Sequence, residues 1–399
     1  PETIQETATP QPLNWQAAML AGEGLIEVGL VSARREKPGQ RLYARAQDWL
    51  VAALGHDNLQ ARERATAGRI LARLGDPRFD PEHWYLPNEA LFGFVPLSGG
   101  PFCMGTDEEE IPELVITLGG DKSLYEAERP KHTLTLPDFY ISHFPVTNAQ
   151  FQAFVNAGGY DHRPYWVEAA ELGRWKVENG RGAIRDWEGN ERTCPYNYGE
   201  PFTLANHPVV GVTWYEALGY SRWLNEQLYS LALVKMQALE NEVQDPAQRG
   251  FWRGLAEGLL HVRLPSEAEW ERAARSADGR QYPWQGKYDP EKANTSETAI
   301  GATSTVGCFP AGKSAEGVQD LSGNVWEWTR SIFRNYPYPG PDDTRSIQQR
   351  EAASSTALRV LRGGSFINIR WYARSTPRDS YGPDARHRYF GFRLVVSQL

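Results

Sequence analysis

The most informative stretch of this 399-residue chain is RLPSEAEWE, residues 263–271. Ser266 stands three residues before Glu269, so the hydroxyl and the carboxylate can each satisfy a free backbone amide at the start of a helix. Trp270 and Ala273 then follow at the spacing of one helix face. We therefore expect a helix that begins at Ser266 and buries this face.

The chain around this stretch is rich in turns. From Phe92 onward, short apolar runs are separated by Gly, Pro, Asn and Asp, which is typical of a loop-rich α+β domain. We expect a second helix to begin near Trp214. Residues 226–261 form a further amphipathic segment, which predicts an inserted helical pair.

The first part of the chain has a different sequence pattern, that of amphipathic helices. One amphipathic stretch ends near Leu54, and a second runs over residues 59–74 until Gly75, a typical helix stop. These patterns predict two domains, a helical N-terminal region over residues 1–90 and the α+β domain over residues 91–399.

Composition excludes several classes of protein. The formal net charge of -8 disfavours a nucleic-acid partner, because binding to phosphates depends on clustered Lys and Arg. No apolar run approaches the roughly 18 residues of a membrane span. Three scattered cysteines and the absence of a signal-peptide pattern predict a reducing, cytoplasmic location. The chain begins at Pro1 rather than at methionine, so a longer chain upstream is left open.

One motif imitates a nucleotide site. Residues 307–314 read GCFPAGKS and match the pattern of a phosphate-binding loop. The next residues, AEGVQD, cannot start the long helix whose amides such a loop uses to hold phosphate. We therefore expect an ordinary turn here.

Several phrases in the α+β domain occur together in order and rough spacing. They are FCMG (102–105), PVTN (145–148), PVVGV (208–212), RLPSEAEWE (263–271), GNVWEW (323–328), RGGS (362–365) and GFR (391–393). In these phrases the domain resembles the formylglycine-generating enzymes, also called sulfatase-modifying factors. The resemblance implies a C-type-lectin-like α+β fold with little regular secondary structure, preceded by a small helical region.

The resemblance also implies a metal centre that this sequence lacks. The family's enzymes bind copper through a cysteine pair shortly after the Gly-Gly-Ser phrase, but here residues 366–374 read FINIRWYAR and no cysteine follows Cys308. Related ergothioneine-forming iron enzymes need a histidine cluster, and the eight histidines show no paired ligand spacing. We therefore expect a non-catalytic protein that requires no cofactor. The alternative is a divergent metal-dependent oxidase or oxygenase that recruits its metal elsewhere.

A structural calcium ion is a second question. The resemblance implies a calcium loop at Ser322, Gly323, Val325 and Glu327, where a carboxylate and carbonyl oxygens would satisfy a hard cation. The alternative is a buried Glu327 paired with an arginine.

The C-terminal tract, residues 362–393, also resembles the variable region of diversity-generating retroelement proteins, which use this fold to display varied side chains. The resemblance implies a fixed frame that includes Arg362, Arg374, Arg386 and Arg393, between which positions encoded by randomised adenines vary. Such codons cannot reach Lys, Glu, Gln, Met or Trp, and none of these occurs at the predicted variable positions. These positions are Ile367, Asn368, Ile369, Tyr372, Pro377, Asp379, Ser380, Tyr381, Gly382, Ala385, His387, Arg388, Tyr389 and Phe390.

The chemistry of these fourteen residues favours a binding surface. Tyrosines offer a large contact area at low entropic cost, and Ser, Gly and Asn adapt their hydrogen bonds. The alternative is core packing, which Ile367 and Ile369 would allow through their strand spacing. We expect most of the set to be exposed and to bind an unknown ligand, a protein or another macromolecule. The remaining alternative is an undiversified sensing or adaptor module of a bacterial signalling protein.

Overall fold

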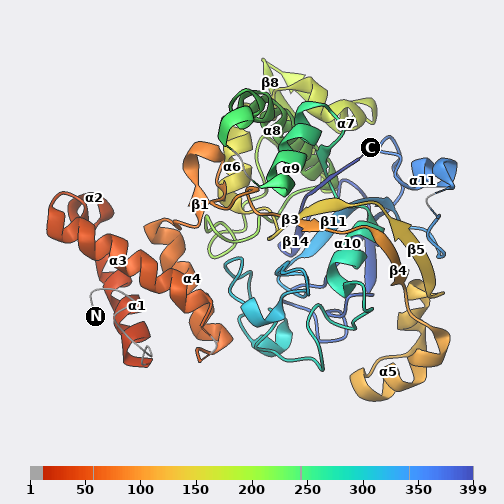
Figure 1. Ribbon diagram of the computed structural model, residues 1–399, viewed down its shortest axis with the longest axis horizontal. Coiled ribbons are helices and arrows are strands. Elements are labelled where there is room, and N and C mark those ends of the chain that lie inside the picture. Colours follow the sequence, from red (N-terminus) through yellow and green to blue (C-terminus); the bar gives the residue numbers. More distant parts are fainter. Residues whose placement is uncertain (1–11, 57, 243–244, 341, 399) are drawn as a thin grey trace.

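The computed structural model describes residues 12–56, 58–242, 245–340 and 342–398. Figure 1 shows a helical N-terminal region beside a larger domain of short strands, helices and long loops. None of the helices in these ranges combines the length and apolarity that crossing a bilayer requires.

The N-terminal region consists of α1 (Pro12–Val28), α2 (Leu30–Ala33), α3 (Lys37–Leu54) and α4 (Ala61–Leu74). The helices end earlier than the predicted boundary at residue 90, because Gly75 has a positive φ of 94° that turns the chain out of the helix. Residues after it already form the two-stranded sheet of β1 (Phe79–Asp80) and β2 (Leu86–Pro87). Residues 1–11 of the predicted region lie outside the described ranges.

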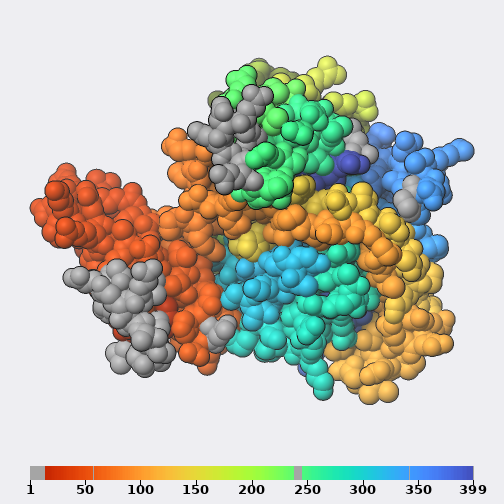
Figure 2. Space-filling view, in the orientation of Figure 1, coloured from red at the N-terminus to blue at the C-terminus, as the bar shows by residue number. Residues whose placement is uncertain are grey.

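Helix α4 packs directly on the larger domain, whereas the rest of the region projects from it as a lobe (Figure 2). Arg64 is buried at this contact and donates hydrogen bonds to the carbonyls of Cys308 (2.8 Å) and Glu291 (2.7 Å). The approach is close at Gly68, where a Cβ atom would lie only 2.3 Å from Oγ1 of Thr305. The glycine is therefore what lets the two surfaces meet.

Two four-stranded sheets form the centre of the larger domain. The first is antiparallel in the order β10 (His261–Arg263), β15 (Val395–Ser397), β6 (Phe139–Ser142), β3 (Phe94–Leu97). The second has the order β13 (Arg378–Tyr381), β12 (Arg359–Arg362), β11 (Trp326–Ile332), β14 (Phe390–Phe392), with β11 and β14 parallel. Three of its four strands come from the C-terminal tract or border it, so this sheet positions the tract.

Smaller elements complete the domain. The minor sheets pair β4 (Gly100–Met104) with β5 (His132–Leu136), and β8 (Arg181–Arg185) with both β7 (Trp175–Glu178) and β9 (Glu191–Arg192). The shorter helices are α5 (Ile111–Leu118), α6 (Asn148–Asn156), α7 (Val167–Glu171) and α11 (Thr344–Arg350).

The predicted helix after Pro265 is confirmed as α10 (Glu267–Arg275). Ser266 accepts a hydrogen bond from the amide of Glu269 (3.1 Å), and the Glu269 carboxylate accepts one from the Ser266 amide (2.6 Å). The expected helix at Trp214 is also present as α8 (Trp214–Glu242), but it does not end before residue 226. The predicted inserted pair is therefore the second half of α8 followed by α9 (Pro246–Ala256).

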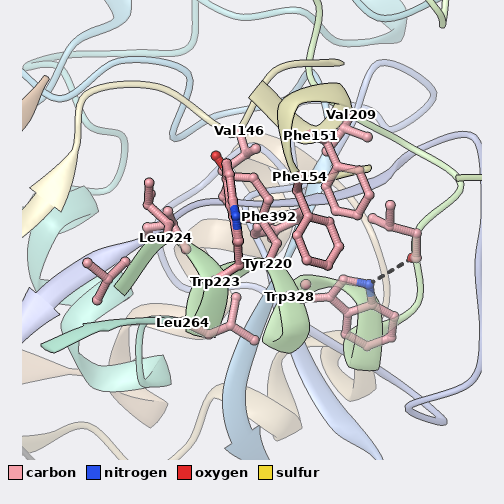
Figure 3. Packing of buried hydrophobic residues seen from close by; sticks show 14 of the residues in the cluster. Val146, Phe151, Phe154, Val209, Tyr220, Trp223, Leu224, Leu264, Trp328 and Phe392 are labelled. Atoms are coloured by element: carbon pink, nitrogen blue, oxygen red, sulfur yellow. Dashed lines mark hydrogen bonds between the residues drawn. The ribbon is translucent and has the colours of Figure 1, made fainter. Parts of the chain in front are cut away.

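The main core lies between these helices and the sheets. Figure 1 shows α8 and α9 on one side of the central strands and α10 on the other. Aromatic rings fill this core. The ring centroid of Phe392 in β14 lies 6.2 Å from that of Phe151 and 5.5 Å from that of Tyr220 (Figure 3). The indole of Trp328 donates a hydrogen bond to the carbonyl of Val212 (3.3 Å), so its one polar atom is satisfied within the core.

The GCFPAGKS motif of residues 307–314, which matches the phosphate-loop pattern, forms an ordinary turn, as the sequence predicts. Gly307 has φ 79°, residues Pro310–Gly312 make a single short 3-10 turn, and no α-helix follows before β11.

Candidate functional site

A frame of buried arginines supports the C-terminal tract. Arg362, Arg374, Arg386 and Arg393 are each at most 3% exposed, and each is ion-paired with a buried carboxylate. The partners are Glu271, Glu128, Asp186 and Glu327, the last three at 2.6 Å. Several of the guanidinium groups also donate to backbone carbonyls, as Arg362 does to those of Thr376 and Ser375. The four arginines are therefore buried and ion-paired, as the predicted scaffold role requires.

Most of the predicted variable residues lie at the surface. Eleven of the fourteen are partly or fully exposed, and Ile367, Ile369 and Arg388 are the most open. Pro377, Ala385 and Phe390 are buried, so for these three the predicted exposure is wrong. Phe390 belongs to β14, and its ring packs 5.3 Å from that of Trp328 in the core.

Five aromatic side chains gather on this surface and define what we term the aromatic face: Trp187, Tyr372, Tyr381, His387 and Tyr389. The His387 ring stacks on Tyr389 at 4.8 Å with an angle of 4° between the ring planes. Tyr381 and Trp187 approach the same imidazole edgewise, at 5.6 Å and 4.9 Å. All five rings are accessible, and Trp187 is 45% exposed.

Trp187 was not among the residues predicted from the sequence. It lies in the turn between β8 and β9, and its backbone amide donates a hydrogen bond to the carbonyl of Asp384 (3.0 Å), which fixes it beside the tract. The available signal was a large apolar residue inside the turn sequence DWEGN, residues 186–190, where side chains are usually small or polar.

One carboxylate lies among these rings. Asp379 and Tyr381 are two residues apart on the edge strand β13, so their side chains point to the same face of the sheet. The Asp379 carboxylate accepts a hydrogen bond from the amide of Ser380 (2.8 Å) and has no ion pair among the described residues. Burial raises the pKa of this carboxyl group. The tract's other acidic residue, Asp384, is ion-paired with Arg174 at 2.6 Å.

The histidine of the face is held neutral. Burial, and secondly the nearby positive charge of Arg386, lower the pKa of His387. The face therefore presents an uncharged imidazole ring at neutral pH.

The residues of the implied calcium loop do not fit a cation. The Glu327 carboxylate accepts hydrogen bonds from the Trp270 indole (2.6 Å) and from Arg393 (2.6 and 2.8 Å), so both oxygens are used and a guanidinium lies against them. The Ser322 hydroxyl donates to the carbonyl of Ala373 (2.6 Å), and the Gly323 carbonyl accepts from the amide of Val325 (2.9 Å). This geometry favours the ion-paired alternative for Glu327.

The stretch that corresponds to the family's copper-binding cysteines does not fit copper either. Ile367, Asn368 and Ile369 follow the Gly-Gly-Ser phrase, and the Asn368 amide oxygen accepts a hydrogen bond from Ser365 (2.6 Å). Among the described residues, no three His, Cys, Asp or Glu side chains are grouped as metal ligands would be. Cys308 lies earlier in the chain than this stretch and is buried. Burial raises the pKa of its thiol to about 12, which disfavours the thiolate that binds soft metals.

A separate cleft offers a rival site. It has a volume of about 540 Å³ and lies between α5 and residues 279–288. Its lining includes Glu113, Tyr282, Lys287 and Arg370, and none of the fourteen predicted residues.

Comparisons with known proteins agree with this architecture. A family model described as "Sulfatase-modifying factor enzyme 1-like domain" matches residues 87–398. The chain is 32% identical over 307 residues to a hercynine oxygenase of Mycolicibacterium thermoresistibile, a match that covers 74% of this chain and 56% of the relative. The chain thus spans little more than half the length of that relative.

Two other relatives are covered almost in full. A formylglycine-generating enzyme of Mycobacterium tuberculosis is 30% identical over 349 residues, which covers 77% of this chain and 99% of the relative. The mouse protein named inactive C-alpha-formylglycine-generating enzyme 2 is 29% identical, with coverage of 82% and 92%. Among solved structures, Treponema denticola variable protein 1 aligns with a TM-score of 0.46 and 19% identity over 76% of this chain and 94% of its own.

Proposed function

Since the chain belongs to the sulfatase-modifying factor enzyme 1-like family, we propose that it is a ligand-binding member whose aromatic face, rather than a redox centre, carries the function. The observation that supports this proposal is the aromatic face itself. Five accessible rings lie on a frame whose arginines are buried and ion-paired.

The energetics of such a surface suit binding. Large rings add contact area without losing much side-chain entropy, and a rigid frame avoids the ordering cost that a flexible loop incurs on binding. The apolar side chains of Ile367 and Ile369, 44% and 52% exposed, extend the surface beyond the rings. Exposed apolar groups next to a rigid aromatic cluster are typical of interaction sites.

The comparisons supply a second candidate. Most of the named relatives are oxygenases or formylglycine-generating enzymes, and their names favour a metal-dependent oxidase or oxygenase for this chain. The relative named as inactive shows that a non-catalytic designation also occurs among similar proteins. The two candidates differ in metal content, because an oxygenase of either kind needs a bound copper or iron ion.

Metal analysis therefore separates them. The chain is purified without chelators, incubated with Cu(I) or Fe(II) under anaerobic conditions, desalted and analysed by mass spectrometry. The ligand-binding proposal expects far less than one equivalent of either metal. One equivalent of copper or iron, retained after desalting, would overturn it in favour of the enzyme.

Diversification of the tract is the finer part of the proposal. It rests on the fourteen positions, none of which holds a residue type that the adenine-based scheme cannot reach. Sibling genes from one genome should differ at these positions and agree at the four frame arginines. Agreement at all fourteen would instead support an undiversified sensing or adaptor module.

Ligand capture by the face can be tested without knowing the natural ligand. A random peptide library displayed on phage is selected on the whole chain, and the affinities of the recovered peptides are measured for three variants. Trp187→Ala and Tyr389→Ala alter the aromatic face, whereas Tyr229→Ala alters a tyrosine of α8 that is 43% exposed. We expect the first two variants to weaken binding at least tenfold and the third to leave it unchanged, since central aromatic residues dominate interface energies. Equal affinities for all variants would refute the proposal.

A further inference from the structure

We propose that the aromatic face holds a positively charged group of its ligand, an ammonium or a guanidinium, against the carboxylate of Asp379. This inference rests on the proposed function and adds the chemistry of what the face recognises. It is carried by one carboxylate on the edge strand β13 that shares a strand face with Tyr381 and has no ion pair among the described residues.

The position of Asp379 follows from strand geometry. β13 is the edge strand of its sheet and pairs only with β12, where Leu361 stands opposite Asp379 and Arg359 opposite Tyr381. The side chains of Asp379 and Tyr381 point to the sheet face that also carries the buried Leu361. Because β13 is the edge strand, no further strand of the described chain covers these two side chains on the outer side. Asp379 therefore lies at the border between the core and the accessible rings.

The tyrosines lie close enough to Asp379 to respond to its charge. Burial is the main cause that raises the pKa values of Tyr372, Tyr381 and Tyr389, and the negative charge of Asp379 raises each of them further. The three tyrosines are thus within electrostatic range of one acidic group, and Tyr381 shares its strand face. Aromatic faces attract cations through their quadrupole, and a nearby carboxylate adds direct charge attraction.

The lack of a cationic partner distinguishes Asp379 from the tract's other acidic contacts. Asp384 pairs with Arg174, and the four frame arginines each meet a buried carboxylate. A partly buried carboxylate without a partner is unfavourable, as the raised pKa of Asp379 indicates. A ligand cation would supply the missing partner and would favour the ionised form.

The positively charged side chains near the aromatic face do not pair with Asp379. Arg386 is held by Asp186 and Glu188, both at 2.6 Å, and His387 is neutral. Arg388 is exposed, and no ion pair joins it to Asp379 in the described part of the chain. Since its positive charge lies beside Tyr389, Arg388 would repel a ligand cation rather than assist it.

The test uses a cation and its neutral isostere on the whole chain. Choline and 3,3-dimethylbutan-1-ol have the same shape but differ in charge, and their dissociation constants are measured by ligand-observed NMR titration. We expect choline to bind about tenfold more tightly than the neutral alcohol, the increment that a partly desolvated cation–aromatic contact supports. Nα-acetyl-lysine amide and Nα-acetyl-arginine amide, run in parallel, show whether an ammonium or a guanidinium fits better.

Three variants assign the effect to Asp379. Asp379→Asn preserves the shape and should reduce the preference for choline to what the aromatic rings alone contribute. Tyr229→Phe, on α8 and outside the aromatic face, should retain the preference. Arg388→Ala should increase choline affinity, because it removes a repelling positive charge beside Tyr389. Equal binding of choline and the alcohol to the unaltered chain, binding of neither, or an undiminished preference in Asp379→Asn would each overturn the inference.

Failure here differs from failure of the proposed function. If phage-selected peptides need Trp187 and Tyr389 but bind Asp379→Asn as well as the unaltered chain, only the cation inference falls. If no selected peptide depends on the aromatic face, the proposed function falls, whatever choline does.

Discussion

The substitution Glu128→Gln should destabilise the fold strongly, because it leaves a buried arginine of the frame without its charge partner. Glu128 and Arg374 are each 1% exposed, and the carboxylate accepts hydrogen bonds from Arg374 (2.6 and 3.1 Å) and from Thr106 (2.6 Å). Removal of one member of a buried ion pair costs about 3–5 kcal/mol. We expect a loss of this size in the free energy of unfolding.

The matched control is Glu200→Gln, which removes the same charge from an exposed pair. Arg73 and Glu200 are 50% and 55% exposed, and such pairs contribute at most about 1 kcal/mol. Both free energies come from urea unfolding followed by tryptophan fluorescence. A double variant, Glu128→Met with Arg374→Met, should recover most of the lost stability, because neither member of the pair remains charged. Equal losses for Glu128→Gln and Glu200→Gln would refute the idea that buried ion pairs hold the tract.

Three further outcomes follow from buried groups elsewhere. Burial raises the pKa of Asp320 from 3.8 to about 6, so the folded chain retains a proton that the unfolded chain releases, and stability falls as the pH rises through this window. Asp320→Asn should remove that dependence and add on the order of 3 kcal/mol above pH 6, as measured by urea unfolding at several pH values; an unchanged pH profile would contradict it. Gly68→Leu should separate α4 from Thr305 and speed proteolysis between the helical region and the larger domain, whereas Gly24→Leu, where nothing lies within 4 Å of a new Cβ, should not; equal cleavage rates would argue against tight docking. Ellman's reagent should react at once with the two exposed thiols and with the buried Cys308 only after denaturation, so three fast thiols in the native chain would contradict the structure.

Local signals in the sequence predicted the parts of the fold that depend on neighbouring residues. The capping box of Ser266 and Glu269 defined the start of α10, and Gly75 marked the end of α4. The α8 boundary was missed because nothing near residue 226 breaks a helix, so the chain continues through it. The sequence alone could not show that Phe390 is buried, because β14 is only three residues long and gives no alternation to interpret.

The features that the sequence did not predict depend on contacts between residues that are distant in the chain. Trp187 reaches the face only because the loop of residues 186–190 lies against the tract, about 200 positions later in the chain. The pairing of Glu327 with Arg393, which opposes a calcium ion there, likewise depends on two strands meeting in space. The four frame arginines could be predicted because they lie in a recognisable motif. The carboxylates with which they pair could not be predicted from the sequence.

The most direct test of the proposed face is hydrogen exchange measured by mass spectrometry, with and without a bound phage-selected peptide. Binding at the aromatic face predicts slower exchange in residues 379–389 and no change in α5 or residues 279–288. Slower exchange in α5 and residues 279–288, which line the 540 Å³ cleft, with residues 379–389 unchanged, would contradict the account.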